Sequence, residues 1–123
     1  MSELTSTLES PSKQELLLTQ DLEELHWTSG SLEEARHACH TLVEERLVAC
    51  AQIIPWIEST YLWQAQIETA QETKVILKAL KANRERIVKC LLQLSTYEVP
   101  EIVIVPITGG SAEYLEWVID CCR

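Results

Sequence analysis

The stretch from Ile102 to Val105 constrains the fold most, because its residues are all β-branched and follow one another without polar alternation. Such a run is typical of a β-strand covered on both faces. A buried helix is the weaker alternative, since β-branched side chains lose rotamer freedom there and the run is short. Pro100 and Pro106 bracket the run and mark its ends or a free edge, because proline cannot donate to a ladder. A small protein cannot easily cover a strand twice, so we expect helices on one face and a second subunit on the other.

Length and composition indicate one globular domain. The 123 residues are 46% hydrophobic, which allows a core without cross-links. The net charge of −9 argues against nucleic-acid backbones and anionic membranes as partners. It suits a protein that attracts cations, although solubility alone is the commoner reason for such a charge. No stretch has the length of a transmembrane helix, and the amino terminus lacks the pattern of a signal peptide.

Cysteine usage indicates a reducing compartment. The chain has five cysteines, an odd number, and no C-x-x-C pair, which favours free thiols over a disulfide framework. We therefore expect a cytoplasmic protein. Cys50 and Cys90 read as packing residues, and the adjacent Cys121 and Cys122 as small apolar residues of the last helix.

The amino-terminal part gives the least definite pattern. Residues 1–20 begin polar and rich in serine and threonine, and we interpret them as a tail or irregular extension before a domain spanning residues 21–123. Leu18, Leu22 and Leu25 recur at helical spacing. Leu25 and Trp27 would instead share one face of a strand ending at Thr28, so both readings stay open.

The rest of the chain alternates helical and extended patterns. Ser31 and Glu34 form a capping box for a helix that runs to about Leu47. Its predicted buried stripe consists of Leu32, Ala35, Cys39, Leu42, Val43 and Leu47. The later predicted elements are strands over residues 48–54, 56–63 and 67–79, a helix capped by Asn83, the strand at 102–105, and a last helix capped by Ser111. This order predicts an α+β, ferredoxin-like fold, β-α-β-β-α-β plus a carboxy-terminal helix, in which the first strand is the uncertain member.

Three groups of side chains are candidates for chemistry. His37 and His40, flanked by Glu33 and Glu44, could hold zinc or copper, but a solvated helix face with charge pairs explains them more simply. The tryptophans Trp56, Trp63 and Trp117 could line a cleft, although interface packing is their more frequent use. Glu98 and Glu101, near Tyr97, could do acid–base work, but no nucleophile with its base accompanies them.

From Ser31 onward the chain resembles the CutA family of divalent-cation tolerance proteins. The residues that carry the resemblance are Leu42–Ala51, Ile53-Ile54-Pro55 followed by Ser59–Trp63, Glu72–Lys78, Tyr97–Ile102, Pro106–Gly110 and Tyr114–Trp117. Several stretches in one order are more specific than any single motif.

The resemblance implies a fold like that of the PII signalling proteins and a tight homotrimer whose long hairpins pair between subunits. It further implies a non-enzymatic binding or anchoring scaffold in divalent-metal, particularly copper, tolerance. The family's metal ligands fall on Trp27, Glu72 and Ser95, so only Glu72 is retained as a metal ligand, and thiolate and imidazole, which copper prefers, are missing. The alternative is a PII-like sensor that binds a small molecule in clefts between subunits.

Overall fold

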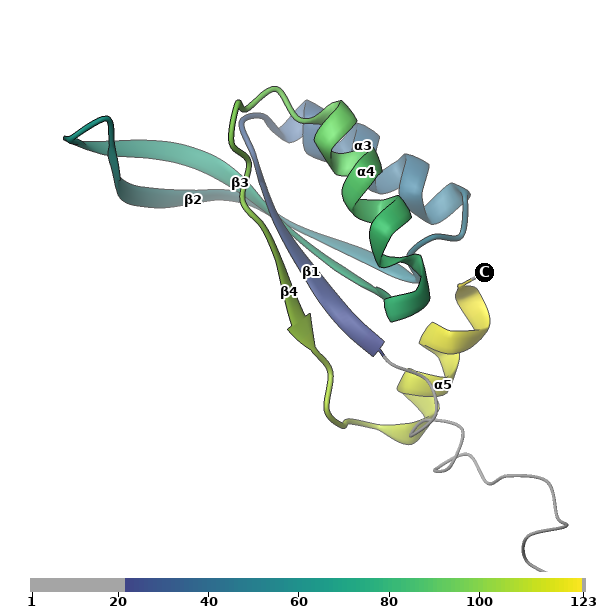
Figure 1. The fold of residues 1–123 in the computed structure, drawn as a ribbon. Coiled ribbons are helices and arrows are strands. Elements are labelled where there is room, and N and C mark those ends of the chain that lie inside the picture. Colours follow the sequence, from purple (N-terminus) through teal and green to yellow (C-terminus); the bar gives the residue numbers. More distant parts are fainter. Residues whose placement is uncertain (1–21, 123) are drawn as a thin grey trace, which may run out of the picture.

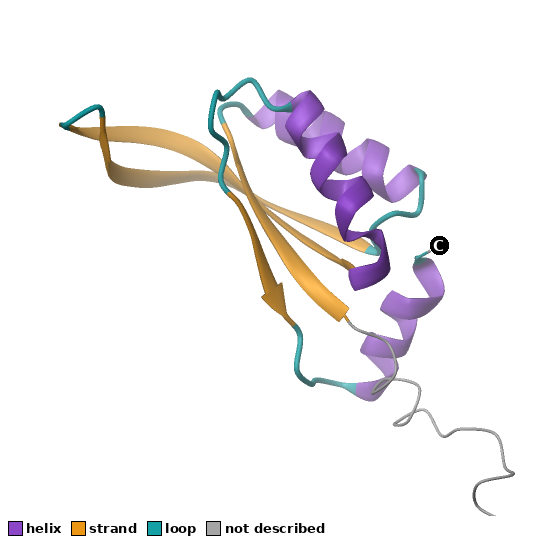
Figure 2. Ribbon diagram, viewed as in Figure 1, coloured by secondary structure: helices purple, strands orange, loops and turns teal. Residues whose placement is uncertain are grey.

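The computed structural model describes residues 22–122 and shows an α+β fold with a sheet backed by helices (Figure 1). The predictions for residues 1–20 lie outside the described residues. Figure 2 shows the alternation of strands and helices along the chain. In chain order the elements are β1 (Leu22–Ser29), α3 (Leu32–Glu44), β2 (Cys50–Trp63), β3 (Gln66–Leu80), a short 3₁₀ turn (Lys81–Asn83), α4 (Arg84–Leu94), β4 (Ile102–Pro106) and α5 (Ala112–Cys121).

The four strands form one antiparallel sheet in the order β2-β3-β1-β4. Leu25 of β1 lies opposite Leu77 of β3 and Ile104 of β4; Leu25 and Leu77 belong to the main core, and Ile104 packs against it. Helices α3 and α4 cover this face of the sheet, whereas α5 packs near Leu22 at the far end (Figure 1). The predicted ferredoxin-like fold with a PII-like architecture is therefore confirmed. Among the described residues, no helix is long and apolar enough to cross a membrane.

The uncertain first strand forms, and it occupies the centre of the sheet. Its polar residues are tolerated because each has a partner. Glu23, only 3% exposed, accepts two hydrogen bonds of 2.6 Å from the Arg84 guanidinium. Glu24 contacts the His26 ring nitrogen at 2.8 Å on the opposite face. Pairing with charged neighbours thus overrides the weak strand pattern.

Helix α3 starts as predicted but ends earlier. The Ser31 hydroxyl accepts from the Glu34 backbone N–H at 3.1 Å, which is half of a capping box. The other half was predicted wrongly, since Ser29 and not Glu34 accepts from the Ser31 N–H. The helix ends at Glu44 instead of Leu47. Val43, which lies within the helix, is 43% exposed and does not belong to the buried stripe, whereas Leu47 is buried.

Residues 50–80 form a hairpin whose far end extends beyond the rest of the molecule (Figure 1). The kink that the sequence suggests at Pro55 is a β-bulge between Ile54 and Ile57 within one continuous strand. The Thr73 hydroxyl donates to the Pro55 carbonyl at 2.8 Å, which stabilises this irregularity. The hairpin is as long as predicted, and none of the other described elements covers its end.

Two predicted helix caps are wrong in their chemistry. Asn83 precedes α4, but its side chain does not cap it: the amide donates to the Leu47 carbonyl at 3.0 Å and accepts from Arg86 at 2.6 Å. Ser111 precedes α5 and likewise makes no capping side-chain bond. Asn83 instead fastens the start of α4 to the segment that follows α3.

Strand β4 confirms the predicted extended run at the edge of the sheet, but within one chain it is covered on one face only. Ile102 and Ile104 pack against the main core. Val103 and Val105 point the other way and are 45% and 38% exposed. A single chain therefore does not provide the second cover that the sequence pattern predicts.

Candidate functional site

The histidines of α3 do not form a metal site. His37 and His40 are exposed, and His40 contacts Glu44 at 3.3 Å. Within residues 22–122, no group of three or more histidine, cysteine, aspartate or glutamate side chains is arranged to hold a metal ion. Cys39 faces the core, where burial and the neighbouring Cys50 raise its pKa to about 11. The simpler interpretation of this helix face, charge pairs in solvent, is the one that the geometry supports.

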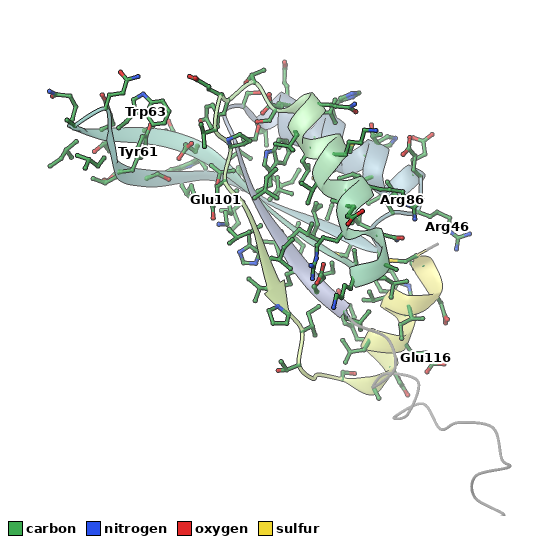
Figure 3. The ribbon with its side chains drawn as sticks, in the orientation of Figure 1. Arg46, Tyr61, Trp63, Arg86, Glu101 and Glu116 are labelled. Atoms are coloured by element: carbon green, nitrogen blue, oxygen red, sulfur yellow. The ribbon has the colours of Figure 1, made fainter. Side chains whose placement is uncertain are left out.

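A cavity of about 390 Å³ lies where the hairpin meets β1 and the segment before β4. We call it the hairpin pocket. Tyr61 and Trp63 project from the hairpin, and Glu101 lies just before β4 (Figure 3). The pocket is lined by Thr28, Ser59, Tyr61, Trp63, Glu72, Tyr97, Glu98, Val99 and Glu101.

Strand periodicity brings the hairpin side chains to one face. Ser59, Tyr61 and Trp63 alternate along β2, so all three point the same way. Glu72 on β3 lies opposite Ile57 of β2, which alternates in step with Ser59, Tyr61 and Trp63. Glu72 therefore points to the same face of the hairpin. The bulge between Ile54 and Ile57 sets this register for the outer half of the hairpin.

The segment that carries Tyr97 and the two nearby glutamates is fixed by Glu34. The Glu34 carboxylate accepts from the Ser29 hydroxyl at 2.6 Å and from the Thr96 backbone N–H at 3.0 Å. The Tyr97 ring lies against Gly30, where an added Cβ would come within 3.0 Å of the ring. Gly30 is thus needed for this close approach, which places the tyrosine in the wall of the pocket.

Tyr97 and Glu72 form one electrostatic unit. Burial raises the pKa of the Tyr97 hydroxyl far above its usual value, and a hydrogen bond to Glu72 and the negative charge of Glu72 raise it further. Tyr97 therefore stays neutral at physiological pH and donates to the Glu72 carboxylate.

Glu101 is the most strongly held carboxylate of the pocket. Burial alone would raise its pKa, but hydrogen bonds from the Thr28 hydroxyl at 2.5 Å and the Lys74 ammonium at 3.2 Å, with the charges of Lys74 and His26, lower that pKa below its usual range. Glu101 is thus ionised and paired. A carboxylate held in this form is unsuited to act as a general acid.

The comparisons with known proteins agree with this architecture. The family model described as "CutA1 divalent ion tolerance protein" matches residues 25–121. The chain belongs to the CutA1 family. A divalent-cation tolerance protein CutA from Thermus thermophilus is 40% identical over 91 residues, which cover 74% of this chain and 88% of that protein. The chloroplastic CutA of Arabidopsis thaliana is 35% identical over 96 residues, covering 78% of this chain and 53% of that protein.

Solved CutA1 structures share the fold. The structure from Thermus thermophilus matches with a TM-score of 0.80 at 36% identity and covers 83% of this chain and 99% of that one. The structure from Oryza sativa matches with a TM-score of 0.80 at 29% identity and covers 84% and 94%. The chain spans about half the length of the plant relatives, 53% for Arabidopsis and 54% for rice. The names of the Thermus thermophilus protein and structure describe tolerance to divalent cations and not an enzymatic activity.

The comparisons contradict the predicted cytoplasmic location. The Arabidopsis relative is named chloroplastic, and a solved relative from Archaeoglobus fulgidus is titled a periplasmic divalent cation tolerance protein. Free cysteines alone were therefore an insufficient basis for assigning a compartment.

The positions expected to hold metal in this CutA1-family chain are only partly brought together. Glu72 lines the hairpin pocket. Trp27 is fully buried in the main core, and its indole N–H has no hydrogen-bond partner in the described structure. The Ser95 hydroxyl is also buried without a partner there. Neither offers the thiolate or imidazole that copper prefers, so the residues present do not fit a copper site.

Of the other candidates, Glu98, Glu101 and Tyr97 do meet in one site, as does Trp63. Trp56 and Trp117 lie outside it and are exposed. Sequence reasoning missed Thr28, Ser59 and Lys74. The alternation Ser59-Tyr61-Trp63 was the available signal for one wall, whereas the Lys74–Glu101 pair joins residues far apart in the chain and left no local pattern.

Proposed function

We propose that this chain is a non-enzymatic, homotrimeric CutA-type protein that acts in the response to divalent cations as a binding or anchoring scaffold. The observation that supports assembly is uncovered apolar surface on the sheet edge and on the hairpin. Val103 and Val105 are exposed on β4, and the cross-strand pair Leu62 and Ile67 near the hairpin end is 69% and 79% exposed. A neighbouring subunit would cover these side chains.

The hairpin pocket supports a non-catalytic role. No cysteine or histidine is among its lining residues, and Glu101, the carboxylate that accepts from the Thr28 hydroxyl, is also paired with Lys74. Glu101 is held in its ionised form by Lys74 and Thr28. These features suit binding of a positively charged ligand.

We infer that Glu72 is the metal contact that one subunit contributes, with further ligands from a neighbour. Oxygen donors alone face the pocket, so the donor chemistry favours a hard divalent cation over copper. Calorimetry with Mn(II), Zn(II) and Cu(II) tests this. In the general affinity order Cu(II) binds more tightly than Zn(II) and Mn(II). We expect the affinities of Mn(II) and Zn(II) to be higher, relative to that of Cu(II), than this order gives. We expect Glu72→Gln to weaken metal binding at least tenfold.

Glu58→Gln is the matched control, because Glu58 lies on the same hairpin but does not line the pocket. It should leave the affinity unchanged. Absence of binding for all of these metals, or binding that Glu72→Gln does not alter, would reject Glu72 as a ligand.

A second candidate function is a PII-like sensor that binds a small molecule in the same pocket. Its aromatic lining by Tyr61, Trp63 and Tyr97 favours this reading, because ligand sites are largely apolar with a few polar groups. A bound metabolite would then raise the melting temperature of metal-free protein. No shift across a broad panel of metabolites would count against it.

A further inference from the structure

We propose that the hairpin pocket binds a small organic cation of the alkylammonium class. This inference rests on the second function proposed above and names the chemistry of its ligand. The starting observation is that aromatic rings and carboxylates line the same cavity. A metal site does not require the rings, and a purely apolar pocket does not require the carboxylates.

The aromatic wall supplies the first part of the argument. Tyr61 and Trp63 come from β2 and Tyr97 from the segment before β4, so rings line the cavity from two separate elements. Aromatic faces attract cations whose charge is spread over alkyl groups, and such rings are the usual means of recognising quaternary ammonium ligands. Tyr97 is protonated at physiological pH, as tyrosine ordinarily is, so its ring is a neutral part of this wall.

The charge of the lining residues indicates that the ligand is positively charged. Glu72, Glu98 and Glu101 line the cavity, and no lysine, arginine or histidine is among the lining residues. Lys74 pairs with Glu101 from outside the lining set. Glu72 accepts from the neutral Tyr97, and Glu98 makes no ion pair among the described residues, so the cavity keeps negative charge that a cation would balance.

The spacing of the carboxylates favours an organic cation over a bare metal ion as the ligand. Within the described part of the chain these glutamates do not converge as a metal-holding group. A molecular cation does not need convergent ligands, because its charge is spread over several atoms that contact rings and carboxylates at once. The cavity of about 390 Å³ is in the size range of small-molecule sites.

Calorimetry on the full-length, metal-free protein tests the proposal with choline, tetramethylammonium and butylammonium. The matched neutral probe is 3,3-dimethylbutan-1-ol, which has nearly the shape of choline without its charge. We expect at least one of the cations to bind and the neutral alcohol to bind at least tenfold more weakly than choline. Equal binding of choline and the alcohol, or no binding of any of the cations at millimolar concentration, would overturn the proposal.

Two variants and a control test whether choline binds in this pocket. Trp63→Leu and Glu98→Gln should each weaken choline binding at least threefold. Trp56→Leu should not, because Trp56 is on the same strand but is exposed outside the cavity. Light scattering on each variant checks that assembly is unchanged. Glu98→Gln alters only an exposed side chain, so it tests the site even where Trp63→Leu disturbs the hairpin. Choline binding that neither variant weakens would assign it to another site and overturn the proposal.

The outcome is separable from that of the proposed functions. Metal binding lost in Glu72→Gln without any alkylammonium binding would retain the divalent-cation role and reject only this inference. If a neutral or anionic metabolite stabilised the protein and this effect depended on Trp63, the sensor function would be supported and the alkylammonium ligand would be rejected.

Discussion

At the scale of single residues, the structure depends on polar side chains that find distant partners. Glu23 is held by Arg84, Glu34 by Thr96, and Glu101 by Lys74. The sequence shows the residue types but not these pairings, because each joins separate elements. This is why the strand around Glu23 looked interrupted, and why only part of the hairpin pocket could be predicted from local spacing.

The Tyr97 hydroxyl gives a prediction that depends on pH. Its pKa is raised in the folded state, first by burial and then by Glu72, so its contribution to stability is fully present below the ordinary tyrosine pKa of about 10 and is lost as the pH rises toward the folded value. We expect Tyr97→Phe to lower the free energy of unfolding by about 1 kcal/mol at pH 8 through loss of the hydrogen bond.

Urea unfolding of wild type and Tyr97→Phe between pH 8 and about pH 11 measures this. The difference in the free energy of unfolding should shrink above about pH 10, because only the wild type must keep the tyrosine protonated. A difference that stays constant across the whole range would show that the Tyr97–Glu72 contact does not shift the titration.

At the scale of elements, periodicity predicted most of the helices and strands, and the errors fall where tertiary contacts decide. At Pro55 the sequence suggested a kink, and the bulge there lets β2 continue through the proline as one strand. Helix α3 ends early because Arg46 adopts a left-handed backbone conformation and its guanidinium bonds to the Asp120 and Cys121 carbonyls of α5. Neither the bulge nor the contacts of Arg46 leave a pattern that can be recognised in the local sequence.

The hairpin turn gives a prediction for this scale. Gln64 and Ala65 both have positive φ, at 50° and 65°, which suits a two-residue turn but strains residues that carry a Cβ. We expect Ala65→Gly to raise the free energy of unfolding by about 1 kcal/mol, because glycine has no steric penalty in this region. Thermal or urea unfolding measures the change.

Ala70→Gly is the control on the same hairpin, since Ala70 lies within β3 and has no positive φ. Glycine there should lower the free energy of unfolding by about 0.5–1 kcal/mol. Destabilisation by Ala65→Gly as large as that by Ala70→Gly would mean that the turn is not strained in the way its backbone angles indicate.

At the scale of the whole molecule, the run Ile102–Val105 predicted both the strand and its unequal exposure in one chain. Ile102 and Ile104 contact the core under the helices, while Val103 and Val105 remain on the uncovered face. The hairpin end is likewise without cover from the rest of residues 22–122. A lone chain would expose this apolar surface to water, and the proposed assembly of copies would cover it.

Light scattering coupled to size-exclusion chromatography on the metal-free protein tests this account most directly. We predict a single species with three times the chain mass of 14.0 kDa, unchanged on dilution to micromolar concentration. A stable species at 14.0 kDa would contradict the account, because one chain would then leave the valines of β4 and the hairpin apolar pair in water.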